Sequence, residues 1–204
     1  MGIVYAAELR PSKMELLAEW LPLQEWFDGG GSPLVRLGSF RFDDPAGEVG
    51  TETILVGAGH NIYQVPLTYR SAPLENAAAF LVGTMKHSVL GDRWVYDATG
   101  DPVYQGELAA ALLTGKPAVV EYREVDGKIQ TLPATAQLLS SGTAGTAVPT
   151  MDMAVTSTVN GVTTIVAGTV GIKVLRALDA AAVAGEGLSA TWAGQDEPVQ
   201  LATL

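Results

Sequence analysis

PLTYRSAPLENAAAFLVGTMKHSVLGDRWVYD, residues 66–97, is the stretch around which the fold is organised. It begins with a β-prone run, continues through an Ala-rich segment, and ends in two apolar runs separated by Gly91-Asp92. We predict a strand, a short helix over residues 72–80 with Pro73 in its first turn, and strands over 80–85 and 93–96. The stretch also carries the densest set of large polar and aromatic side chains in the chain: Tyr69, Arg70, His87, Arg93, Trp94, Tyr96 and Asp97.

The residues before this stretch predict one helix and an antiparallel meander. Ser12 and Glu15 have capping-box spacing, and apolar residues at helical spacing follow until Pro22. Residues 3–9 are β-prone, and strands are expected over 34–42, 51–56 and 62–69. Turn residues 43–47, DDPAG, separate the first two strands of the meander.

The residues after it predict a second helix and then strands only. Asp101-Pro102 opens a helix over residues 103–113 and Gly115 closes it. Asp126-Gly127 and Asn160-Gly161 are two-residue hairpin signals. The second hairpin pairs Val159 with Val162 and predicts a buried face made of Val155, Val159, Val162 and Val166.

Together these patterns predict an α+β fold, with a helix packed on a curved antiparallel sheet and a β-rich C-terminal part. We expect a mixed domain over residues 1–116 and a β-rich region over 117–204, with a Ser/Gly/Thr-rich loop at 138–150.

Composition excludes several classes of protein. The chain has 204 residues, 48% apolar content and a net charge of −10, which is typical of a folded protein that repels nucleic acid and anionic lipid. It has no cysteine, so disulfides and thiolate chemistry are excluded. The N-terminus lacks a secretory leader, and an uncharged run of membrane-spanning length, residues 153–172, carries five Thr and a hairpin signal. We expect a cytoplasmic protein without a membrane span.

No catalytic, cofactor or metal motif is present. His60 and His87 lack metal-ligand spacing, the glycines at 29–31 and 57–59 lack the rest of a phosphate-binding motif, and Asp43-Asp44 has the context of a turn. The predicted binding surface therefore consists of aromatic and fork-like polar side chains, a combination suited to holding sugar rings and hydroxyls: Arg70, His87, Arg93, Trp94 and Asp97.

Three segments carry a family resemblance. MELLAEWLPLQEWFDGGG (14–31), LGSFRFDDPAGEVGTE (37–52) and residues 65–115 resemble the N-terminal cap domain of bacterial maltokinases, and more closely stand-alone maltokinase-cap-like proteins. The resemblance implies an α+β unit with a helix against a curved antiparallel sheet. In whole maltokinases the cap precedes kinase-like lobes that bind ATP, magnesium and maltose. This sequence lacks those lobes, so no kinase residue can be carried over.

Three functions stay open at this point. The first is a non-catalytic protein that binds a glucan or a protein partner in trehalose, maltose or glucan metabolism. The second is a small sugar-acting enzyme that uses acids near Asp97 and His87. The third is a structural subunit that forms a homo-oligomer through a sheet edge.

Overall fold

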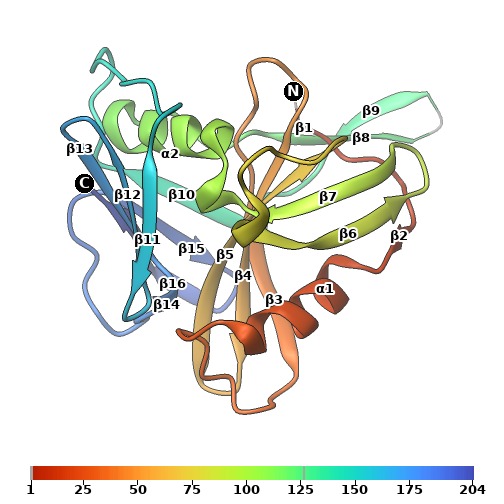
Figure 1. The fold of residues 1–204 in the computed structure, drawn as a ribbon, viewed down its shortest axis with the longest axis horizontal. Helices are drawn as coiled ribbons and strands as arrows, with labels where there is room; N and C mark the ends of the chain where they lie inside the picture. The colour runs from red at the N-terminus through yellow and green to blue at the C-terminus, as the bar shows by residue number, and fades with distance from the viewer. Residues whose placement is uncertain (1, 126) are drawn as a thin grey trace.

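Three antiparallel or mixed sheets and two α-helices make up the chain in a computed structural model that describes residues 2–125 and 127–204 (Figure 1). The fold is α+β, mostly β, with one helix packed on each of the two large sheets. The fold class predicted from the sequence is confirmed.

The first large sheet contains the predicted meander. Its strand order is β2-β6-β7-β5-β4-β3, and β14 adds to β5 from the far end of the chain. The bounds are β2 Leu9–Arg10, β3 Leu34–Phe40, β4 Gly50–Ala58, β5 Asn61–Arg70, β6 Leu81–His87, β7 Gly91–Asp97 and β14 Ala177–Leu178.

Helix α1 (Lys13–Trp20) begins at the predicted capping box. The Ser12 hydroxyl accepts a hydrogen bond from the Glu15 N–H, and the Glu15 carboxylate accepts one from the Ser12 N–H. Its apolar stripe then packs on one face of the first sheet, together with the 3-10 turn η1 (Leu21–Leu23). The core formed there is Leu16, Leu17, Trp20, Leu21, Ile54, Val56, Ala58, Tyr63, Val65, Leu67, Met85 and Val95.

The second large sheet comes from the C-terminal part, in the order β10-β15-β16-β13-β12-β11. Helix α2 (Pro102–Thr114) starts at Asp101 and ends at Gly115, as predicted. One hydrophobic cluster joins α2, the far face of the first sheet and the second sheet. The strands are β10 Ala136–Ser140, β11 Val155–Val159, β12 Val162–Ala167, β13 Val170–Leu175, β15 Leu188–Trp192 and β16 Gln195–Thr203.

A buried ion pair also links the two parts of the chain. Arg176 is 1% exposed, and its guanidinium donates to the Asp97 carboxylate over 2.6 Å and to the Thr99 hydroxyl over 2.8 Å. Thr99 lies in the 3-10 turn η3 (Ala98–Gly100), which leads directly into α2. Because both charges are buried, each one offsets the free energy that the other loses when it is removed from water.

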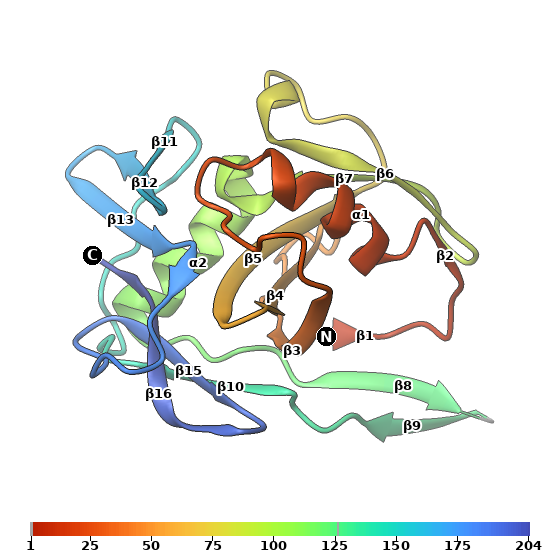
Figure 2. The ribbon, with the colours of Figure 1, turned by 90° about the horizontal axis from the view of Figure 1, so that it is seen from below.

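The third sheet is small, in the order β1 (Gly2–Ile3), β8 (Glu121–Val125), β9 (Lys128–Thr131). The β8–β9 hairpin extends away from the rest of the molecule (Figure 2). Its predicted turn residue Asp126 lies outside the described residues, but Val125 and Lys128 pair beside it as expected. The strand predicted over residues 3–9 is interrupted, since only its two ends pair, in β1 and β2.

Three local predictions are wrong. Residues 72–80 form only the short 3-10 turn η2 (Ala78–Phe80), because Asn76 has a φ of 58° that a helix cannot contain. Residues 138–140 continue β10, so the predicted loop at 138–150 starts later. The β11–β12 register is the predicted one, yet its four-valine face is turned toward solvent and Thr163 and Ile165 lie inside.

None of the described helices is long and apolar enough to cross a lipid bilayer.

Candidate functional site

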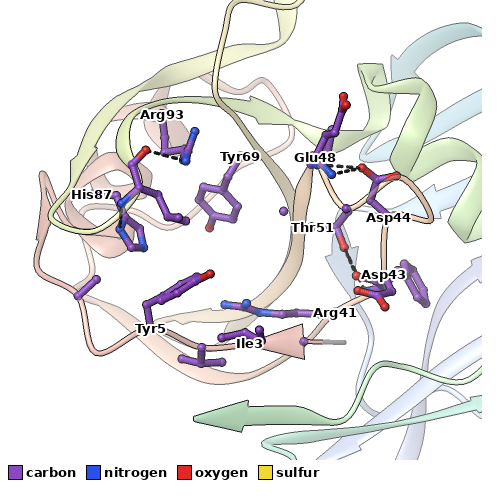
Figure 3. A pocket seen from close by; sticks show the side chains of 18 of the residues that line it. Ile3, Tyr5, Arg41, Asp43, Asp44, Glu48, Thr51, Tyr69, His87 and Arg93 are labelled. Atoms are coloured by element: carbon purple, nitrogen blue, oxygen red, sulfur yellow. Dashed lines mark hydrogen bonds between the residues drawn. The ribbon is translucent and has the colours of Figure 1, made fainter. Parts of the chain in front are cut away.

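A cavity of about 670 Å³ opens between the N-terminal segment, the loop before β4, and strands β5, β6 and β7 (Figure 3). Its volume lies in the range of about 300–1,000 Å³ that is usual for small-molecule pockets. The lining mixes aromatic rings with both signs of charge. The side chains with rings or charges are Tyr5, Lys13, Arg41, Phe42, Asp43, Asp44, Glu48, Tyr69, His87 and Arg93.

The loop that forms one wall is held by Asp44. Its carboxylate accepts hydrogen bonds from three backbone N–H groups, those of Ala46 (3.0 Å), Glu48 (2.9 Å) and Val49 (2.8 Å). The Thr51 hydroxyl closes the base of the loop by bonding to both backbone groups of Phe42. The Asp-Asp-Pro-Ala-Gly turn predicted from the sequence therefore forms one wall of the pocket, and side-chain hydrogen bonds fix its conformation.

Glu52 lies buried beneath this pocket, at 1% exposure, among three cations. Its carboxylate forms ion pairs with Lys13, with Arg36 (3.1 Å) and with Arg41 (3.9 Å). Burial alone would raise the pKa of Glu52, but the charges of Lys13, Arg41 and Arg36 outweigh it and lower this pKa to about 2. Burial and the two arginines lower the pKa of Lys13, against the opposing effect of Glu52.

Tyr69 connects this buried cluster to the cavity. Its hydroxyl donates to Glu52 over 3.1 Å, and the Lys13 ammonium lies 5.1 Å from its ring centre. Burial, followed by the charge of Glu52, raises the pKa of Tyr69 well above 10, so the phenol stays protonated at neutral pH. The site thus offers a fixed, neutral aromatic ring in one wall.

His87 and Arg93 form the opposite rim. The Nδ1 atom of His87 accepts from the N–H groups of Val89 (3.2 Å) and Leu90 (3.1 Å), which places a proton on Nε2 in the neutral ring. Burial, then the charges of Arg93 and Lys13, lower the pKa of His87. The rings of His87 and Tyr5 pack edge to face at 5.9 Å, and Arg93 donates to the Leu90 carbonyl over 2.7 Å.

Part of the chain that forms this pocket is similar to a known protein family. Residues 20–101 match the family described as the Maltokinase N-terminal cap domain. The chain contains a maltokinase cap-like domain. A comparison with curated proteins finds no match. The matched segment includes α1's last residue, the whole meander, β6 and β7, so the cap-like domain supplies most of the pocket wall and the residues before it supply the rest.

The cap-like domain brings two of the five predicted site residues together, His87 and Arg93. Trp94 alternates to the opposite face of β7, where it is half-buried and does not line the pocket. Arg70 and Asp97 also lie elsewhere, in ion pairs with Asp101 and Arg176. A binding role for all five residues stays a prediction.

Sequence reasoning missed the residues that complete the pocket of the cap-like domain, above all Tyr5, Arg41 and Thr51. They come from three separate segments, and no spacing between them is visible along the chain. The one available signal was Tyr69, which lies on β5 directly opposite Val95 of β7 and therefore shares a face with Arg93. Within residues 2–125 and 127–204, no group of three or more His, Asp or Glu side chains could hold a metal ion.

Proposed function

We propose that this protein binds without catalysing a reaction, and that the pocket of its cap-like domain holds a short neutral glucan of the maltose type. The observation that carries the proposal is the lining itself. Tyr5 and Tyr69 offer aromatic rings, while Arg41 and Arg93 offer donors and Glu48 offers an acceptor from other walls (Figure 3). Rings that stack on a pyranose and fork-shaped donors that reach its hydroxyls are the two components of a sugar site.

The charge balance favours a neutral ligand over a phosphorylated one. Lys13 is already paired with Glu52, and Arg41 lies 3.0 Å from Glu121 as well as near Glu52. The loop wall adds acidic side chains to the same cavity. A phosphate would meet these carboxylates without a free cation cluster to offset them, whereas sugar hydroxyls can bond to both signs of charge.

The state of the acids supports binding rather than glycoside chemistry. A glycosidase needs one carboxylic acid with a raised pKa and a second carboxylate about 5–9.5 Å away. Here Glu52 is held ionised with a pKa of about 2, and Asp44 is occupied by three backbone N–H groups. Glu52 therefore cannot serve as the proton donor near neutral pH, and the Asp44 carboxylate is engaged in holding the loop.

Calorimetric titration with maltose, trehalose and maltotriose tests this function. We expect heat of binding with at least one glucan, a loss of at least tenfold in affinity for Tyr5→Ala, and little change for Trp94→Ala. Trp94 is the control, because it is a half-buried aromatic on β7 that lies outside the pocket. No heat with any of the three sugars, or an equal loss in both variants, would refute the proposal.

A second candidate is binding to a protein of trehalose, maltose or glucan metabolism. It is favoured by the projecting β8–β9 hairpin, on which Ile129 is 73% exposed (Figure 2). Pull-down against maltokinase and trehalose synthase is the test, with Ile129→Lys as the variant. The candidate requires that one of these proteins is retained by the wild type and lost with the variant; retention of neither removes it.

A further inference from the structure

Strand β11 forms one end of the second large sheet, and β12 is its only neighbour among the described strands (Figure 1). Its sequence, Val155-Thr156-Ser157-Thr158-Val159, reads the same in both directions. An antiparallel pair of two such strands centred on Ser157 would therefore place Val155 opposite Val159, Thr156 opposite Thr158, and Ser157 opposite itself.

The free backbone groups fit that register. Val159 and Val162 flank a two-residue turn, and such a turn is closed by a hydrogen-bonded pair. Because pairing alternates along an antiparallel ladder, the N–H and C=O groups of Thr156 and Thr158 point away from β12. Across a two-fold axis at Ser157 these are the groups that would bond to each other, Thr156 of one copy with Thr158 of the other.

The other end strands of the described sheets are protected against such pairing. β3 contains a register shift between Arg36 and Gly38, and β9 begins with Lys128. β1 and β2 have two residues each, and Pro11 follows β2. Hydrogen bonds between Thr135, next to β10, and Ser39 of β3 tie down that end of the second sheet. Charges, bulges, prolines and short length are the usual means by which a sheet edge avoids another strand. β11 has none of them, and its register with β12 is uninterrupted.

The surface beside this edge is apolar and uncharged. Val155 is 71% exposed, Val159 66% and Val166 45%, all on one face of the β11–β12 hairpin. The hairpin lies in an uncharged run of the chain, residues 153–172. Each copy carries a net charge of −10, and pairing along this uncharged run brings no like charges of β11 into contact.

We propose that β11 is a homodimer interface, in which two copies pair antiparallel about a two-fold axis through Ser157 and join their sheets into one. The interface is isologous, as a closed dimer requires, and the same strand supplies both sides. It lies on the C-terminal sheet, so it does not depend on the proposed glucan site.

Light scattering coupled to size exclusion tests the dimer and its register. We expect the wild type at twice the 21.3 kDa chain mass and Ser157→Lys at the single-chain mass, because the two lysines would lie directly opposite each other. Val166→Lys is the matched control: Val166 faces Val155 on β12, on the same exposed face but away from the edge and opposite the uncharged Gly171, and this variant should stay dimeric.

Charge complementation makes the test specific. Ser157→Lys and Ser157→Asp should each be monomeric, and an equimolar mixture should recover the dimer mass with one copy of each. Far-ultraviolet circular dichroism checks that every variant is folded. A monomeric wild type, a dimeric Ser157→Lys, or a mixture that stays monomeric would each overturn the proposal.

Discussion

Replacing Glu52 by Gln removes the buried negative charge on which the pocket floor is built. The side chain keeps its shape, but Lys13, Arg36 and Arg41 are left around a neutral amide. The pKa of Glu52 falls from 4.5 to about 2 on folding, which corresponds to about 3 kcal/mol at about 1.4 kcal/mol per pKa unit. In proteins generally, removing one partner of a buried ion pair lowers the free energy of unfolding by about 3–5 kcal/mol. We therefore expect a loss of about 3 kcal/mol in the free energy of unfolding at pH 7.

The pH dependence of that loss has a definite sign. Because the pKa of Glu52 is lower in the folded than in the unfolded chain, its stabilisation is complete above pH 4.5 and is lost as the pH falls toward about 2. The wild type should thus lose its advantage over Glu52→Gln in acid, by about 2 kcal/mol between pH 5 and pH 3.

Urea unfolding of both proteins across this pH range is the assay, with Glu121→Gln as the control. Glu121 also contacts Arg41, over 3.0 Å, but its side chain is 26% exposed, so its loss should cost under about 1 kcal/mol. The reasoning is refuted if Glu52→Gln and Glu121→Gln are equally stable, or if the cost of Glu52→Gln does not change with pH.

Three further changes test contacts and backbone conformations in the rest of the fold. Arg176→Met should destabilise the fold by about 3 kcal/mol or more in urea, since it leaves Asp97 charged and buried, and adding Asp97→Asn should recover part of that loss; no recovery contradicts the pairing. Asp101→Ala should lower the melting temperature more than Asp101→Asn, which keeps an acceptor for the first turn of α2; equal effects would argue against the cap. Gly161→Ala should cost about 1 kcal/mol because its φ is 74°, while Gly171→Ala, at a position without a positive φ, should cost less.

The sequence predicted correctly those helix ends and turns that are stabilised by residues close to them in the chain. The capping box at Ser12, the glycine that ends α2 at Gly115, and the Asn160-Gly161 turn each satisfy or direct backbone groups within a few residues, so no distant partner is needed. The resemblance of residues 14–115 to a maltokinase cap agrees with the match over residues 20–101.

The predictions that failed depend on partners far away in the chain. The buried face of the β11–β12 hairpin contacts distant parts of the chain: Ile165 and Ala167 join the hydrophobic cluster, and the Arg176 guanidinium donates to Thr163 over 2.7 Å. A polar residue such as Glu52 in the middle of a strand gives no sign that cations will surround it. The pocket was only partly predictable for the same reason, since its walls come from segments that the topology, and not the sequence spacing, brings together.

The most direct test of the glucan site is a two-dimensional amide NMR titration of the ¹⁵N-labelled protein with maltotriose. The account predicts saturable shifts confined to the pocket, at Tyr5, Val49, Tyr69, His87 and Arg93. Shifts that cluster elsewhere, for example at Gly29–Ser32 in the groove beside α1, or no shifts at all, would contradict it.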